Sequence, residues 1–177
     1  MSNNRLLYFS CAWLLVGVLL GGIAWWASQA YRADKVYVTL WQTQFTDLQG
    51  RIKKLSKPNK RPLMINFWAT WCQPCREEMS DLAALARALQ GKVDFVGIAV
   101  DNATEVHQFL TNTPVPYPIL LGQADVIALM RAEGNTVGGL PFTVIYAANG
   151  QQVMAKAGKI QKALLAQSLH SAINDTN

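Results

Sequence analysis

Cysteine and histidine are scarce in this chain of 177 residues, which contains three cysteines and two histidines. The cysteines are Cys11, Cys72 and Cys75, while His107 and His170 each stand far from any second histidine. A structural zinc site needs about four cysteine or histidine ligands. We therefore expect neither a metal site nor a bound cofactor.

Charged residues are also few, at 15% of the chain with a net charge of +5. The densest basic stretch, residues 51–61, contains Arg51, Lys53, Lys54, Lys57, Lys60 and Arg61 and no acidic residue. Such a stretch can contact anionic lipid or an acidic partner, but a solvated hairpin and loop is the favoured explanation. No aromatic residue lies among these charges, so the sequence does not support nucleic-acid binding.

Charge is absent altogether from Leu6 to Ala27. As a helix this run would span roughly 33 Å, about the thickness of the hydrocarbon core of a membrane. Trp25 at its far end suits a membrane interface. Residues 28–30 have the small-x-small pattern of a signal-peptide cleavage site, but the apolar region of a signal peptide usually runs about 7–15 residues. We favour a retained transmembrane anchor over residues 1–30, with a cleaved signal peptide as the alternative.

Two of the three cysteines form a Cys-x-x-Cys pair between an apolar strand predicted over 63–67 and an amphipathic helix predicted over 74–89. Pro74 fits the first helical turn. Cys72 then lies beside the unpaired N–H groups and the positive dipole end of the helix, which favours a thiolate. A thiolate with a second thiol, Cys75, one turn away can exchange disulfides. We predict a redox-active pair rather than a structural disulfide or two inert thiols.

Alternating strand and helix patterns continue along the chain. We predict strands over 93–100, 118–121, 142–147 and 153–157, helices over 104–110, 125–132 and 161–173, and a hairpin over 45–52 with its turn at residues 49–50. Such an order gives a central mixed sheet with helices on both faces. We assign residues 31–44 to a juxtamembrane segment and residues 45–177 to one domain.

Two sequence strings carry a resemblance to a known family. They are FWATWCQPCREEM at residues 67–79 and GLPFT at residues 139–143. Together they resemble the membrane-anchored, thioredoxin-like TlpA/ResA family of bacterial thiol-disulfide oxidoreductases, from about Phe45 to the C-terminus. The resemblance implies a thioredoxin-like fold with a helix–strand insertion between Asp101 and Asn135. Phe142 is a departure, because a small polar residue is common at that position.

The resemblance also implies roles for individual residues. Cys72 becomes the exposed attacking thiolate and Cys75 the buried resolving thiol. Pro141 becomes the family's cis-proline, packed against the pair, and the backbone of Leu140 holds a substrate strand by hydrogen bonds. Trp71 caps the sulfur pair. The implied substrate-binding residues are Trp71, Gln73, Pro74 and Leu140.

The proton acceptor implied by the resemblance is Glu78. Asn66 stands where cytoplasmic thioredoxins have a buried aspartate, and an asparagine cannot take a proton. Glu78 matches the family's alternative, a glutamate one turn beyond Cys75 that deprotonates this thiol when the mixed disulfide is released. The other interpretation is an ordinary carboxylate on the helix surface. We expect the neighbouring Glu77 to face solvent.

The direction of electron flow is predicted from the two residues between the cysteines. Gln73-Pro74 lacks the histidine of strongly oxidising Pro-His pairs, so we expect a reduction potential nearer thioredoxin's, about −270 mV, than DsbA's, about −120 mV. The cysteine pair of a reductase outside the cytoplasm must be reduced again after each turnover, which implies a transmembrane electron donor of the DsbD/CcdA kind. The family's clients are disulfide-containing proteins such as apocytochrome c or copper-site assembly factors.

The sequence also predicts a location and leaves rival functions open. We place the domain on the periplasmic side of a bacterial inner membrane, because a tethered dithiol is most useful where disulfides persist. A disulfide-introducing oxidase uses the same residues but transfers electrons in the opposite direction, from the client to the cysteine pair. A dithiol chaperone or Cu(I)-binding protein is a non-enzymatic rival. A thiol peroxidase is less well supported, because the expected Pro-x-x-x-Thr-x-x-Cys spacing is absent.

Overall fold

The computed structural model describes residues 17, 19–23, 25 and 39–174. The chain divides into two units, Met1–Tyr37 and Val38–Asn177. In the first unit the described residues are helical, and most of the anchor predicted over residues 1–30 lies outside them. No helix built from the described residues combines the length and the apolarity that crossing a membrane requires.

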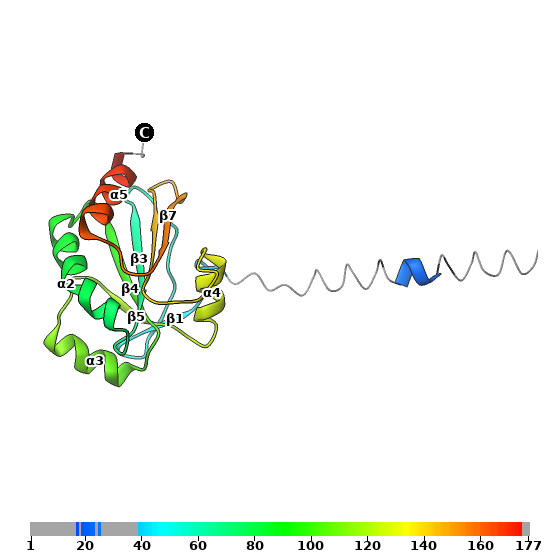
Figure 1. Ribbon diagram of the computed structural model, residues 1–177, viewed down its shortest axis with the longest axis horizontal. Coiled ribbons are helices and arrows are strands. Elements are labelled where there is room, and N and C mark those ends of the chain that lie inside the picture. Colours follow the sequence, from blue (N-terminus) through cyan, green and yellow to red (C-terminus); the bar gives the residue numbers. More distant parts are fainter. Residues whose placement is uncertain (1–16, 18, 24, 26–38, 175–177) are drawn as a thin grey trace, which may run out of the picture. The chain divides into compact units, whose positions relative to one another are not determined.

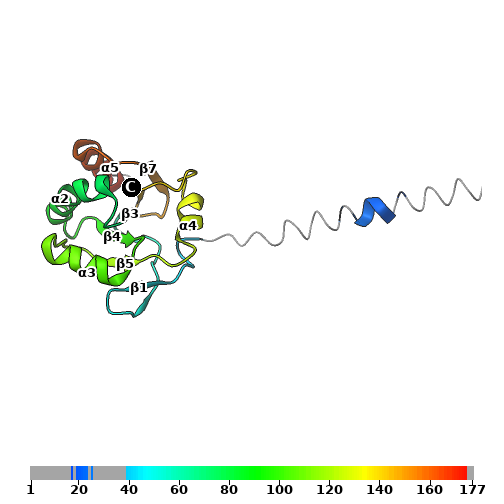
Figure 2. The same cartoon turned by 60° about the horizontal axis from the view of Figure 1, so that its bottom comes forward.

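The second unit is built on one seven-stranded mixed sheet with the order β2-β1-β5-β4-β3-β6-β7. Its strands are β1 Phe45–Asp47, β2 Ile52–Lys53, β3 Leu63–Trp68, β4 Asp94–Ala99, β5 Ile119–Leu121, β6 Phe142–Tyr146 and β7 Gln152–Ala157. Its helices are α2 Gln73–Ala88, α3 Ala103–Asn112, α4 Val126–Ala132 and α5 Lys162–Asn174. The central strand β3 pairs in parallel with β4 and antiparallel with β6. Helices α2, α3 and α5 lie on one side of the sheet and α4 on the other (Figures 1 and 2).

The predicted strands and helices of this unit are all present, and their ends differ from the predicted ones by at most two residues. Helix α3 shows the largest difference. It begins at Ala103 rather than Thr104 and ends at Asn112 rather than Leu110. Its start is fixed by Asn102, whose side chain accepts a 3.0 Å hydrogen bond from the Glu105 amide. A capping side chain of this kind satisfies one of the free N–H groups of the first turn.

Alternate residues of β3 supply the two halves of the core. Met64 and Trp68 belong to the cluster beneath α2, α3 and α5, whereas Ile65 and Phe67 belong to the cluster beneath α4. All four side chains are fully buried, as expected for a central strand covered on both faces. The sheet therefore holds the residues that follow Trp68 in a fixed position at its edge.

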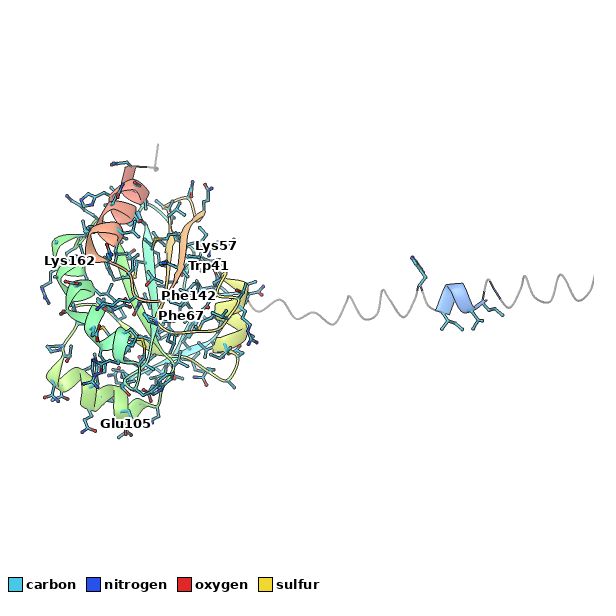
Figure 3. All side chains as sticks on the ribbon, viewed as in Figure 1. Trp41, Lys57, Phe67, Glu105, Phe142 and Lys162 are labelled. Carbon is cyan, nitrogen blue, oxygen red and sulfur yellow. A yellow bond between two sulfur atoms is a disulfide. The ribbon has the colours of Figure 1, made fainter. Side chains whose placement is uncertain are left out.

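The packed core extends upstream of the predicted domain start at Phe45. Leu40 is 1% exposed and Thr43 is 6% exposed. Trp41 packs edge-on against Tyr146, with 5.0 Å between ring centroids; Figure 3 labels Trp41 on the domain. Residues 39–44, assigned from the sequence to a juxtamembrane segment, thus contribute to the interior, because their apolar side chains cover the α4 face of the sheet.

The basic stretch begins in the predicted hairpin. Its turn contains Gly50 with φ 76°, a conformation that glycine adopts without steric penalty. The Asp47 carboxylate accepts hydrogen bonds from the Gln49 and Arg51 amides at 3.0 and 2.9 Å. The same carboxylate pairs with the Arg51 guanidinium at 2.7 Å. Part of this positive charge is therefore neutralised within the hairpin itself.

Candidate active site

The cysteine pair lies at the start of α2, immediately beyond the end of β3. Cys72 is the N-cap residue of the helix, with φ −85° and ψ 101°. Its Sγ accepts a 3.3 Å hydrogen bond from the Cys75 amide. The two cysteines are joined by a disulfide with 5.3 Å between their Cα atoms. In the reduced state the same N–H groups and the helix dipole favour a thiolate on Cys72.

In the disulfide form Cys72 and Cys75 are both buried. Cys72 is 5% exposed and Cys75 is fully buried. The order agrees with an attacking and a resolving cysteine, but Cys72 is not an exposed residue in the disulfide form. The reason is geometric, since its side chain folds back over the first turn of α2 to reach Cys75 and accept its N–H.

Three residues predicted to bind substrate surround Cys72 at the surface. Trp71 is 68% exposed, so its indole stands largely in solvent; its predicted role as a cap on the sulfurs stays a prediction. Gln73 and Pro74 are exposed in the first turn of α2. Trp71 also lines a groove of about 380 Å³ between the start of α2 and α3. The groove is lined by Trp71 and Arg76, the residues that flank the Cys-x-x-Cys segment in the sequence.

The Leu140–Pro141 peptide bond is cis, as the resemblance implied. Pro141 is buried and Leu140 is half-buried. The Pro141 carbonyl accepts a 2.8 Å hydrogen bond from the Gly158 amide, and the Gly139 carbonyl accepts one of 2.7 Å from Asn135 Nδ2. These bonds fix the loop from both sides.

Phe142 stands where a small polar residue was expected, and the fold accounts for it. Its side chain is 1% exposed. Its ring packs against that of Phe67 on β3 with 5.6 Å between centroids, and Figure 3 labels both residues. The larger side chain therefore fills the core on the α4 side of the sheet.

Glu78 is buried, with 2% of its surface exposed. Its Oε1 accepts a 2.9 Å hydrogen bond from Asn66 Nδ2, and its Oε2 accepts one of 3.3 Å from the Ile160 amide. The interpretation as an ordinary helix-surface carboxylate is therefore wrong. Cys75 and Glu78 are three residues apart on α2, a spacing that places both on one helix face.

Burial raises the pKa of Glu78, while the hydrogen bonds from Asn66 and Ile160 and the nearby charge of Lys159 act in the opposite direction. A carboxyl group whose pKa is raised keeps its proton to a higher pH than an ordinary glutamate does. A buried thiol and a buried carboxyl group with a raised pKa therefore share one face of α2.

Glu77 faces solvent, as predicted. Its Oε2 lies 2.6 Å from Lys159 Nζ, and the two side chains are 47% and 48% exposed. The hydrogen bond from Lys159 and a second one from Gln73 lower the pKa of Glu77. Two neighbouring glutamates on one helix thus have opposite environments, one ionised at the surface and one buried.

Three further contributors to the site were not found by sequence reasoning. Thr143 accepts a 3.2 Å hydrogen bond from Asn66 Nδ2 across 77 positions of the chain. Ile160 and Lys159 reach α2 across 82 positions. No local pattern predicts such contacts, because they form only when β6 and the β7–α5 loop fold against α2. Among the described residues, no group of three or more His, Cys, Asp or Glu is placed to hold a metal ion.

Comparison with known protein families places the chain in one of them. The model of the AhpC/TSA family matches residues 36–160. The chain belongs to this family. Within it, the thiol-disulfide oxidoreductase ResA of Geobacillus thermodenitrificans is 30% identical over 128 residues, which cover 71% of each chain. ResA of Geobacillus kaustophilus is 27% identical over 177 residues, covering 97% of this chain and 98% of the relative.

Solved structures with thioredoxin-like folds superpose on this member of the AhpC/TSA family. A thioredoxin-related protein from Neisseria meningitidis serogroup B has a TM-score of 0.66 and 34% identity, covering 73% of this chain and 98% of that one. The resemblance found in the sequence is thereby confirmed. The protein is a thiol-disulfide oxidoreductase with a thioredoxin-like fold.

Proposed function

We propose that the protein is a membrane-tethered reductase of client-protein disulfides that acts outside the cytoplasm. The observation that carries this proposal is the arrangement of three groups on α2. Cys72 caps the helix and accepts an N–H from Cys75, and the buried Glu78 lies on the same helix face as Cys75. This arrangement supplies a nucleophile, a resolving thiol and a proton acceptor.

The proposed reaction begins with the reduced pair. The Cys72 thiolate attacks a client disulfide, forming one mixed disulfide and releasing the first client thiolate. Glu78 then takes the proton of the Cys75 thiol. The Cys75 thiolate attacks Cys72 Sγ, the Cys72–Cys75 bond forms, and the second client sulfur leaves with the electron pair and takes up a proton. The client gains two electrons and the protein ends in the disulfide form.

The client segment is proposed to lie across the surface formed by Trp71, Gln73, Pro74 and the Leu140 backbone. An extended segment that pairs with a free backbone edge gains affinity without a specific sequence. The exposed indole of Trp71 offers an apolar contact next to Cys72, and the groove that it lines adds mainly polar side chains. Such a surface suits a client that presents its disulfide in an extended chain, such as an apocytochrome c or a copper-site assembly factor.

The direction of electron flow is proposed from the residues between the cysteines. The helix terminus stabilises the Cys72 thiolate, and neither Gln73 nor Pro74 adds a positive charge to it. The reduced form is therefore less strongly favoured than in an oxidase such as DsbA, where a stabilised reduced form makes the disulfide a strong oxidant. A reductase needs fresh electrons after each turnover. We propose that a transmembrane dithiol donor of the DsbD/CcdA kind supplies them.

The tether and the location rest on the N-terminal sequence. Leu6 to Ala27 carries no charge, which is typical of a segment that spans a membrane. The match to ResA of Geobacillus kaustophilus covers 97% of this chain, so the likeness includes this region. We propose a single-pass anchor in the inner membrane with the catalytic domain on the periplasmic side.

The first experiment is a measurement of the reduction potential, by equilibration with glutathione or dithiothreitol and thiol trapping. A value below about −220 mV supports the reductase, and a value near −120 mV makes the protein an oxidase. The absence of any reversible two-electron transition would favour a dithiol-binding protein. Cys72→Ser is the control, because it removes the transition without altering the fold.

A further inference from the structure

Three of the four residues between β7 and α5 contact three separate parts of the site. The Gly158 amide donates to the Pro141 carbonyl at 2.8 Å. Lys159 Nζ lies 2.6 Å from Glu77 Oε2. The Ile160 amide donates to Glu78 Oε2 at 3.3 Å. We call residues 158–160 the strap, since they join the cis-proline loop to the active-site helix.

The backbone of the strap limits how it can meet α2. Gly158 has φ 80°, a conformation that side chains rarely permit, and Ile160 is buried in the core. Between these two fixed points Lys159 extends to the helix surface. Its ion pair with Glu77 therefore lies one residue away from the amide that holds Glu78.

We propose that Lys159 is a positioning residue for the proton acceptor. Its ion pair with Glu77 holds the strap against α2, which keeps the Ile160 N–H on Glu78, and its positive charge favours the Glu78 carboxylate. This inference rests on the proposed role of Glu78 as the acceptor of the Cys75 proton. It assigns part of that role to a residue outside the Cys-x-x-Cys and cis-proline motifs.

The surroundings of Glu78 single out Lys159 as the relevant charge. Asn66 and Thr143, on β3 and β6, are neutral hydrogen-bonding groups. Tyr117, which packs on Met79 of α2, is a neutral phenol whose pKa burial and the charge of Glu78 raise further. Among the described residues, Lys159 is the cation whose charge opposes the effect of burial on the pKa of Glu78.

A second ion pair, Lys162–Asp81, lies beside the strap and has nearly the same exposure as the Lys159–Glu77 pair. Lys162 Nζ lies 3.2 Å from Asp81 Oδ1, with side chains that are 51% and 47% exposed. The Lys159–Glu77 pair is 48% and 47% exposed. Both pairs join α2 to the segment around the start of α5, and Figure 3 labels Lys162 there. The pairs differ in that only Lys159 adjoins the amide bonded to Glu78.

The test measures the resolving step on the full-length reduced protein with the disulfide reagent dithionitrobenzoate. Cys72 releases the first thionitrobenzoate, and attack by Cys75 on the mixed disulfide releases the second. The rate of the second release is followed against pH in the wild type and in Lys159→Met, Lys159→Arg and Lys162→Met. Low ionic strength is used, because salt screens exposed charges.

We expect Lys159→Met to shift the acid limb of this profile to higher pH by about half a unit. Lys159→Arg restores the wild-type profile, because it keeps the charge, and Lys162→Met leaves the profile unchanged. An unshifted profile in Lys159→Met, or an equal shift in Lys162→Met, overturns the inference.

Glu78→Gln separates this inference from the function on which it rests. If Glu78→Gln abolishes the acid limb while Lys159→Met leaves it in place, the role of Lys159 alone is rejected. If Glu78→Gln leaves the limb unchanged, Glu78 is not the proton acceptor, and both the proposed mechanism and the role of Lys159 fail.

Discussion

Asn66 Nδ2 donates a 2.9 Å hydrogen bond to Oε1 of Glu78, and both side chains are almost completely buried. The bond joins the central strand β3 to the helix that carries the two cysteines. Because an asparagine cannot titrate, it orients the carboxyl group without competing for its proton. Glu78 is therefore the titratable member of this buried pair.

Replacing Asn66 should therefore disturb both stability and the resolving step. Asn66→Ala leaves Glu78 Oε1 without its donor, and an unsatisfied buried polar group costs about 1–3 kcal/mol. The pKa of Glu78 should rise further, because the lost hydrogen bond favours the carboxylate. Urea unfolding and the pH profile of the second thionitrobenzoate release measure the two effects. Thr143→Val is the control, since it removes the other partner of Asn66 and leaves Glu78 its donor.

The burial of Glu78 also predicts a pH dependence of stability. Its pKa in the folded protein is raised above the ordinary value of 4.5, so the folded state binds this proton more tightly than the unfolded state. The stabilisation that protonated Glu78 gives to the folded state is fully present below pH 4.5. It is lost as the pH rises through the pKa of Glu78 in the folded protein. The free energy of unfolding of the wild type, minus that of Glu78→Gln, should fall across this range in urea titrations of the disulfide form. A difference that is constant with pH would contradict the prediction.

Loss of the resolving cysteine should trap clients. In Cys75→Ser the Cys72 thiolate still attacks a disulfide, but nothing displaces the client from the mixed disulfide. We expect covalent adducts to accumulate and the second release of thionitrobenzoate to disappear, as seen on non-reducing gels and by absorbance. Cys72→Ser should form no adduct. A peroxidase would behave differently, because its first step with peroxide does not need Cys75.

The packing of residues 39–44 can be tested at Leu40. Its side chain is 1% exposed and belongs to the core on the α4 side. Leu40→Ala should lower the free energy of unfolding by about 2–5 kcal/mol, from lost burial and the cavity left behind. Ile52, which is 67% exposed, provides the control, since Ile52→Ala should change stability by about 0.5 kcal/mol or less. Equal effects of the two changes would show that residues 39–44 do not stabilise the domain.

Local sequence patterns were sufficient for the elements of the domain. The apolar run of β3 and the three-and-four spacing of α2 reflect burial on fixed faces, and such periodicity depends on neighbouring residues only. The glycine at position 50 marked the hairpin turn for the same reason. In the disulfide form Cys72 is buried because its side chain folds over the first turn of α2, and no local sequence pattern shows that contact.

The sequence by itself determined the positions of the two cysteines, the helix that they begin and the glutamate one turn beyond them. These features are local, because a helix terminus creates free N–H groups wherever it occurs. Only the tertiary structure decided that Glu78 is buried and that Asn66, Ile160 and Lys159 surround it. Those contacts join segments up to 82 positions apart, and the burial and charge that set a pKa arise from what the fold packs around the group.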